Sequence, residues 1–169
     1  MAKNKSGSLD TNILLRLIVG DVPEQTAVIE TLLTEATVLQ VADIAIFETV
    51  FVLQSYYQFS REDIYGSLTA IVRHPKINCN RRLFEQAFTL YRQYPKLSLV
   101  DCALPLYAEL NNATPLYTFD KDLAKSLANT QALALYNSSS QDIVEEGVFP
   151  TCGLLEPSLT TSFKNVLKN

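Results

Sequence analysis

The chain lacks the residues that would place it in several common functional classes. His74 is the only histidine among 169 residues, which excludes a ribonuclease that works with two histidines. The three cysteines are odd in number and have no metal-type spacing, which is typical of reduced structural thiols. The longest apolar stretch, 41–53, is interrupted by Asp43 and Glu48 and is too short to span a bilayer. No signal-peptide core precedes it, so we expect a cytoplasmic protein with no membrane segment.

Positive charge is also scarce. Fourteen Lys and Arg residues stand against 18 Asp and Glu residues, which gives a formal net charge of −4. This balance argues against a strongly basic nucleic-acid-binding surface, although a local basic rim could still bind phosphates. The hydrophobic content of 47% and the charged content of 19% are those of an ordinary globular protein. The length suits one domain with a substantial core.

The chain does contain four carboxylates that stand beside or inside apolar segments: Asp10, Glu48, Asp101 and Asp120. Burying an ionised carboxylate is costly unless it is paired or bound to a cation. Too few basic residues lie near these four in the sequence to pair them all. A shared divalent metal is the simplest compensation, and it predicts a metal-dependent enzyme.

Short β-branched runs alternate with helical patterns, which predicts an α/β fold with a mainly parallel sheet. Strands are expected to end near Leu9 and to cover 37–42, 115–119 and 131–135. Ligands gather at the carboxyl ends of parallel strands, so Asp10 and Asp120 should lie at that edge. Helices are expected over 12–19, from a capping box at 21–24 to 36, and over 44–57, 60–74, 81–94, 98–112 and 121–127.

The run Asn-Ser-Ser-Ser at 137–140 predicts a domain boundary. We expect one domain over 1–136 and a C-terminal extension over 137–169. Leu159, Phe163 and Val166 have helical spacing and predict a short amphipathic helix in the extension. This helix would pack back onto its own domain or dock onto a partner.

Three of the four acids have a second interpretation as helix caps. Asp10 and Asp120 precede expected helices, and Ser98 with Asp101 fits a capping box. Glu48 lies inside a helix that is apolar on almost every side, where capping offers no explanation. A buried Glu48 could instead be protonated or paired with a lysine. Glu48 therefore carries the argument that the four acids form one site.

Four ordered segments, 9–16, 47–57, 100–103 and 118–123, resemble the PIN domain, and among its members they look most like the VapC toxins of bacterial toxin–antitoxin pairs. The resemblance implies a three-layer α/β/α fold with a mainly parallel central sheet. It also implies an endoribonuclease that depends on Mg²⁺ or Mn²⁺. The partners implied are an RNA substrate, a second subunit in a homodimer, and a cognate antitoxin that occupies the active-site groove.

The motifs of the resemblance assign roles to particular residues. The four acids fall on the acidic positions of the family, where three would bind the metal and Glu48 would orient a water. The accessory positions are Asn12, Thr118 and Asp122, and the candidates for steering the RNA backbone are Arg16, Lys121 and Lys125.

Two alternatives remain open at this stage. Pro105 lies four residues after Asp101 and is expected to kink that helix, which favours a non-catalytic PIN-like binding module. A hydrolase that uses Asp10 as a nucleophile has weaker support, because Asn12 stands where such a family would carry a second Asp.

Overall fold

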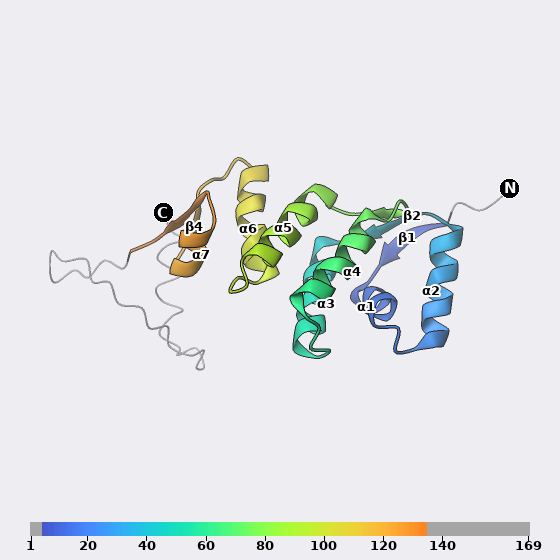
Figure 1. Cartoon of the computed structure of the whole chain (residues 1–169). Helices are drawn as coiled ribbons and strands as arrows, with labels where there is room; N and C mark the ends of the chain where they lie inside the picture. The colour runs from blue at the N-terminus through green and yellow to red at the C-terminus, as the bar shows by residue number, and fades with distance from the viewer. Residues whose placement is uncertain (1–4, 135–169) are drawn as a thin grey trace, which may run out of the picture. The chain divides into compact units, whose positions relative to one another are not determined.

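The structure is a computed structural model that describes residues 5–134, and residues 5–133 belong to one compact unit (Figure 1). Its helices are α1 (Thr11–Val19), α2 (Pro23–Glu35), α3 (Asp43–Ser55), α4 (Arg61–Arg73), α5 (Arg81–Gln93), α6 (Leu99–Leu110) and α7 (Lys121–Ser126). Its strands are β1 (Lys5–Leu9), β2 (Ala36–Val41), β3 (Ile77–Asn78), β4 (Leu116–Thr118) and β5 (Thr130–Ala132). The extension predicted over 137–169 and its helix lie outside the described residues.

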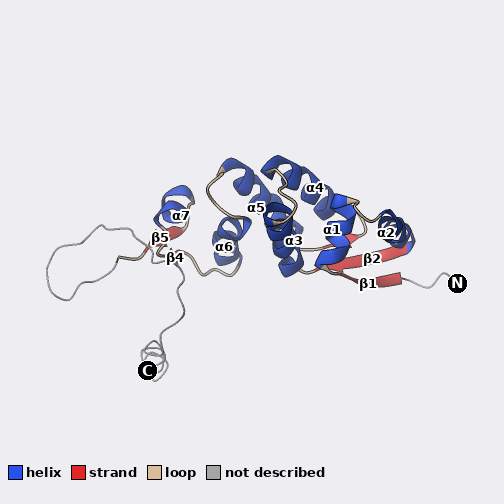
Figure 2. Cartoon of the chain, turned by 90° about the horizontal axis from the view of Figure 1, so that it is seen from below, coloured by secondary structure: helices blue, strands red, loops and turns tan. Residues whose placement is uncertain are grey.

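The strands form two separate parallel sheets, drawn in red in Figure 2. The first sheet has the order β1-β2-β3, with Leu9 opposite Val41 and Leu39 opposite Ile77. The second sheet pairs β4 with β5. Helices connect all paired strands, as parallel pairing requires. The predicted α/β class with a parallel sheet is confirmed and is consistent with a three-layer α/β/α fold. The two-residue strand β3 is too short to give a period-two pattern and was not predicted.

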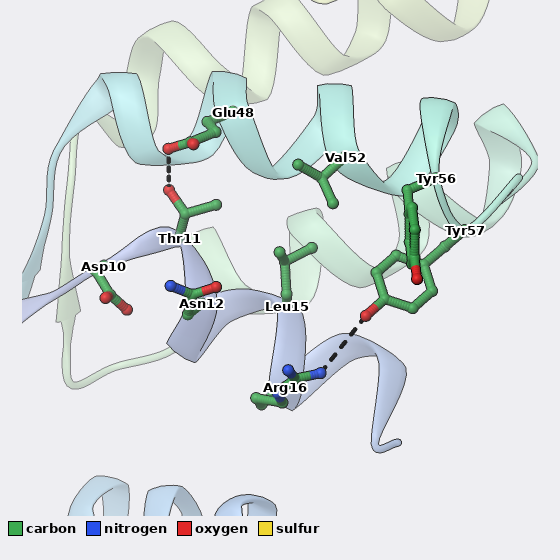
Figure 3. A pocket seen from close by; sticks show the side chains of 9 residues that line it. All are labelled: Asp10, Thr11, Asn12, Leu15, Arg16, Glu48, Val52, Tyr56 and Tyr57. Carbon is green, nitrogen blue, oxygen red and sulfur yellow. Dashed lines mark hydrogen bonds between the residues drawn. The ribbon is translucent and has the colours of Figure 1, made fainter. Parts of the chain in front are cut away.

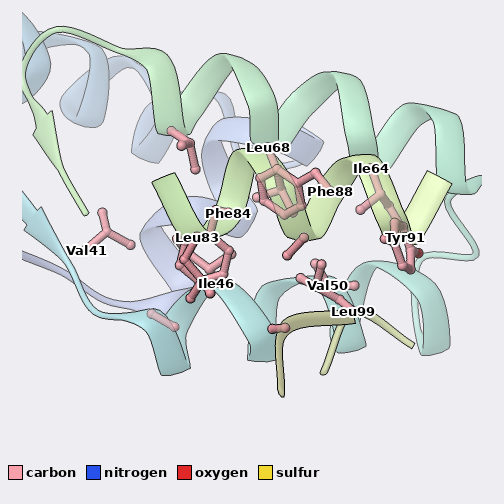
Figure 4. Close-up of a cluster of buried hydrophobic side chains, with 14 of the residues drawn as sticks. Val41, Ile46, Val50, Ile64, Leu68, Leu83, Phe84, Phe88, Tyr91 and Leu99 are labelled. Atoms are coloured by element: carbon pink, nitrogen blue, oxygen red, sulfur yellow. The ribbon is translucent and has the colours of Figure 1, made fainter. Parts of the chain in front are cut away.

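The hydrophobic core is built around α5 (Figure 4). The apolar stripe predicted for this helix is buried, and its members are at most 1% exposed: Leu83, Phe84, Ala87, Phe88 and Tyr91. α5 packs against α4 and α6. α4 contributes Ile64, Leu68 and Val72, α3 contributes Ile46, Val50 and Leu53, and α6 contributes Leu99, Cys102 and Ala103. Burial raises the pKa of the Cys102 thiol to about 12, which keeps this free cysteine uncharged.

Helix α3 differs from its prediction. The sequence suggested a helix buried on nearly every side, but α3 buries one face and exposes the other. Ile44 is 76% exposed and Phe51 is 68% exposed, and Glu48 lies between them on the exposed face. Apolar residues on both faces mask the helical period, so the sequence could not separate the core face from the exposed one.

Arg61 at the start of α4 holds the C-terminal end of α5. Its Nη2 atom donates to the carbonyl oxygens of Tyr91 and Leu97 at 2.5 and 2.7 Å. Its guanidinium also lies 3.5 Å from the centroid of the Tyr91 ring. The bond to Tyr91 satisfies a carbonyl group that the end of α5 leaves free, and a cation is favoured there by the helix dipole. One side chain thus fixes α4, α5 and the turn that leads into α6.

Two local predictions about helices turn out differently. The capping box expected at 21–24 is wrong, because Val22 is the N-cap of α2 and no side chain caps it. Asp21 instead binds Arg16. α6 continues through Pro105, whose ring is buried, so the proline does not end this helix. None of the helices in the described residues is long and apolar enough to cross a membrane.

Replacing a phenylalanine in the core of α5 should destabilise the protein strongly. We expect Phe88→Ala to lower the free energy of unfolding by about 3–5 kcal/mol, because a side chain only 1% exposed leaves a cavity. The matched control Phe51→Ala removes an exposed ring and should change stability by about 0.5 kcal/mol or less. Urea denaturation followed by circular dichroism measures both, and equal losses would contradict the assigned core.

Candidate active site

An open hollow of about 470 Å³ lies where the start of α1 meets α3 (Figure 3). α1 and the residue before it contribute one wall, and α3 with its C-terminal turn contributes the other. The lining residues are Asp10, Thr11, Asn12, Leu15, Arg16, Glu48, Val52, Tyr56 and Tyr57. Of the four acids singled out from the sequence, the hollow contains Asp10 and Glu48.

Asp10 directly follows β1, as predicted, and it caps the next helix. Its Oδ1 atom accepts a hydrogen bond of 2.9 Å from the backbone N–H of Ile13. This bond turns the carboxylate toward the N-terminus of α1. The cap fixes the side chain in place at the carboxyl end of the strand, where α/β proteins bind ligands.

Glu48 reaches the same hollow from α3. The hydroxyl of Thr11 donates a hydrogen bond of 2.5 Å to its Oε2 atom, so α1 and α3 are joined at this point (Figure 3). Glu48 is exposed, which corrects the expectation that it is buried in an apolar helix. Its ionised form is therefore solvated, and burial cost is no argument for a metal here.

Asp101 and Asp120 lie outside this hollow and act as caps of other helices. Asp101 completes a capping box with Ser98, whose backbone N–H and hydroxyl donate to Oδ2 at 2.8 and 2.7 Å. Asp120 caps α7 by accepting from the N–H of Leu123 at 2.9 Å. Within residues 5–134, no group of three His, Cys, Asp or Glu side chains is placed to hold a metal ion. The four-acid site stays a prediction.

Of the three accessory residues predicted from the sequence, one lines the hollow and two lie outside it. Asn12 lines the hollow. Thr118 accepts a hydrogen bond of 2.9 Å from the backbone N–H of Asp120 and so shapes the end of β4. Asp122, Lys121 and Lys125 are exposed on α7 and do not line the hollow.

Arg16 is the cation of the hollow, but its charge is already compensated. Its guanidinium forms an ion pair of 2.6 Å with Asp21 and donates to Gln25 at 3.0 Å. The Arg16 hydrogen bond holds the pKa of the Asp21 carboxyl below its usual range, and Tyr57 donates a further bond to that carboxyl. This pairing leaves less positive charge in the hollow than the sequence suggested.

Sequence reasoning missed one polar contact that joins the two helices bearing candidate acids. Asp43, in the first turn of α3, accepts a hydrogen bond from the hydroxyl of Tyr107 on α6. Asn80 donates to the same carboxylate at 3.4 Å. Burial and the bond to Asp43 raise the pKa of the Tyr107 hydroxyl. No spacing rule relates residues 64 positions apart, so only the tertiary structure reveals this pair.

The fold and the hollow define an α/β domain with a carboxylate at the end of a parallel strand and a second carboxylate from the adjoining helix. The family model of the PIN domain matches residues 8–126, and the chain belongs to this family. A search of curated proteins found no match to this chain. PIN domains are generally nucleases and typically use divalent metals. The expectation from the sequence that this chain is a PIN domain is therefore confirmed.

The oxygen atoms that line the hollow are of the kinds that a small, hard cation binds. Asp10 and Glu48 offer carboxylate oxygens, and Asn12 and Thr11 offer an amide oxygen and a hydroxyl. Mg²⁺ prefers oxygen ligands, keeps several waters, and is commonly held by one or two carboxylates together with substrate phosphates. The hollow can supply two such carboxylates without Asp101 or Asp120.

The bond between Tyr107 and Asp43 should be visible as a pH-dependent part of stability. Tyr107→Phe should lower the free energy of unfolding by about 1 kcal/mol at pH 8, because Asp43 loses a hydrogen-bond donor. The pKa of Tyr107 is raised in the folded state, so its contribution is complete below the unfolded value of about 10 and is lost as the pH rises through the folded value. The difference between the two proteins should therefore shrink above pH 10 in urea denaturation. A constant difference from pH 8 to 12 would contradict the assignment.

Proposed function

We propose that the chain is an endoribonuclease that depends on Mg²⁺ or Mn²⁺ and acts as a VapC-like toxin. The observation that carries the proposal is the hollow of Asp10 and Glu48 in a chain of the PIN domain family. Asp10 stands at the carboxyl end of β1, and Glu48, which accepts a hydrogen bond from Thr11, lines the same hollow. The ordered motifs around Asp101 and Asp120 support the finer assignment to the VapC-like branch.

Asp10 and Glu48 are the residues that would hold the cation. The Oδ1 atom of Asp10 accepts the cap hydrogen bond, so Oδ2 is the oxygen proposed to bind the cation. When bound, the metal would lower the pKa of a coordinated water and stabilise charge developing on the scissile phosphate. Glu48 is also the proposed general base for the attacking water: its carboxylate is exposed, and its Oε2 atom accepts a hydrogen bond from Thr11.

RNA would be bound mainly by shape and by a small number of contacts. The negative net charge and the pairing of Arg16 with Asp21 leave little general attraction for phosphate. Lys121 and Lys125 are exposed on α7 and are proposed to contact the backbone. Such a surface favours recognition of a particular RNA over indiscriminate degradation.

The proposed partners are an antitoxin protein and a second subunit. The exposed apolar side chains of α3 beside Glu48, Ile44 and Phe51, form a face that an antitoxin helix could cover. An inhibitor in this position would block the hollow directly. A gene for a small protein next to this one would support the toxin assignment.

A non-catalytic PIN-like binding module is the second candidate. The specific observation in its favour is that Asp101 and Asp120 are used as helix caps outside the hollow. Such a module would keep the fold and bind RNA or protein without cleaving it. The two candidates differ in one measurement, which is hydrolysis of RNA.

The purified chain should cleave RNA with Mg²⁺ or Mn²⁺, and chelation with EDTA should abolish the cleavage. Asp10→Asn should lower the rate at least about 100-fold, because it removes a ligand charge while Asn still caps α1. The rate is measured on a panel of transfer, ribosomal and messenger RNA with the product ends mapped. Asp63→Asn, which changes an exposed acid of α4 outside the hollow, is the matched control and should retain activity. No cleavage by folded, metal-loaded protein would favour the binding module.

Induction of the chain in a bacterial host should arrest growth if it is a toxin. Glu48→Gln should abolish the arrest, because it removes the proposed base while the Gln side chain keeps an oxygen that can accept the hydrogen bond of Thr11. Growth curves with matched expression levels measure this effect. Arrest that is equal in the wild-type chain and the variant would contradict a nuclease toxin, since it would not require the hollow.

A further inference from the structure

The hollow has an acidic end and an aromatic end, and both lie along α3 (Figure 3). Glu48, Val52 and Tyr56 follow one another at intervals of four residues, so their side chains lie on one face of the helix. The backbone N–H of Tyr56 donates to the carbonyl oxygen of Val52 at 2.9 Å, so the helical geometry continues to Tyr56. The rise of an α-helix places Tyr56 about 12 Å along the axis from Glu48. The aromatic end is therefore near the proposed cation site and separate from it.

The ring of Tyr56 is supported by its neighbours and is still open to a ligand. Tyr56 is 77% exposed. The ring of Tyr57 lies next to it, with centroids 5.0 Å apart and planes at 80°. Tyr57 is itself held, because its hydroxyl donates to Asp21 at 3.1 Å and its ring lies 6.3 Å from that of Phe59. A supported ring that stays exposed is preorganised for binding, since it loses little side-chain freedom when a ligand covers it.

The charge at the aromatic end of the hollow restricts the kind of ligand that it can take. Tyr56 is the C-cap of α3, and the C-terminal end of a helix carries partial negative charge. Arg16, the cation that lines the hollow, is already paired with Asp21. A phosphate group is therefore disfavoured at this end, whereas an uncharged planar group is not. A nucleobase is such a group, and unpaired bases commonly stack on exposed aromatic side chains.

We propose that Tyr56 is a platform on which one unpaired base of the RNA substrate stacks while the scissile phosphate lies at Asp10 and Glu48. The inference rests on the proposed function, which brings RNA into the hollow. Stacking supplies affinity that the scarce positive charge of the chain does not, and it fixes which nucleotide lies at the cation site. Tyr56 binds the base and takes no part in the chemical step.

Stacking is tested directly with a fluorescent base. The probes are synthetic hairpin RNAs, each with 2-aminopurine at one position of the loop, because the fluorescence of this base falls when it stacks on an aromatic ring. The chain carries Glu48→Gln so that the RNA stays intact in the presence of Mn²⁺. At one loop position the complex should be quenched, and the quenching should disappear with Tyr56→Ala and with Tyr56→Leu. Tyr56→Phe should retain it, because the ring is kept.

The contribution of the platform to cleavage is measured in the active chain. Tyr56→Ala should raise KM for the cleaved RNA about 10-fold with a smaller change in kcat, because a stacked base is bound alike before and during the reaction. Tyr56→Phe should restore KM. Abasic residues placed one at a time in the RNA should identify one position that raises KM for the wild-type chain and has no further effect on Tyr56→Ala.

The matched control is Tyr117→Ala, which removes an exposed tyrosine of β4 that does not line the hollow and should keep the wild-type KM. Circular dichroism verifies the folding of each variant. Equal fluorescence with and without the ring of Tyr56 would overturn the platform and leave this ring to a protein partner. A chain that binds none of the hairpins would also overturn it.

The platform and the proposed function fail in different ways. Cleavage of RNA with a KM that Tyr56→Ala does not change overturns the platform while the proposed function stands. Quenching that depends on the ring of Tyr56, in a chain whose wild-type form cleaves no RNA, supports the platform and refutes the proposed nuclease.

Discussion

The packing of α5 is the constraint on which the arrangement of this domain depends. Its buried face, with Phe84, Phe88 and Tyr91 at its centre, is contacted by α4 on one side and α6 on the other. Arg61 reinforces this arrangement by binding the carbonyl groups of Tyr91, in the last turn of α5, and of Leu97, in the turn before α6. Because α6 is held on α5, the position of Asp101 follows from core packing. A candidate site residue is thus held by a helix whose position is set by the core packing around α5.

The acidic residues show how a structural role as a helix cap is compatible with the chemical role proposed for the same side chain. Asp10, Asp101 and Asp120 each accept backbone hydrogen bonds at the start of a helix. A helix N-terminus stabilises a carboxylate through its free N–H groups and its dipole, and it also fixes the direction of that carboxylate. Capping and cation binding are therefore compatible, since each carboxylate has two oxygens. The cap supplies the rigidity that a binding site needs.

Local patterns were enough to predict most elements and to single out four of the nine residues that line the candidate hollow: Asp10, Asn12, Arg16 and Glu48. The stripe of α5, the cap at Ser60 and the position of Asp10 after β1 all arise from interactions between residues close in sequence. The burial of Glu48 was predicted wrongly, because α3 carries Ile44 and Phe51 on its exposed face. Apolar content alone does not reveal which face of such a helix is covered, and a face reserved for a partner resembles a core face.

The sequence by itself determined the family and the α/β class and predicted the residues that the chemistry would require, because motifs and hydrophobic periods are local properties of the chain. The tertiary structure alone decided which of those residues meet. It brought Glu48 to Thr11 beside Asp10, joined Asp43 to Tyr107, and divided the strands into two sheets. Strand pairing and helix packing join residues distant in sequence, which no local pattern predicts.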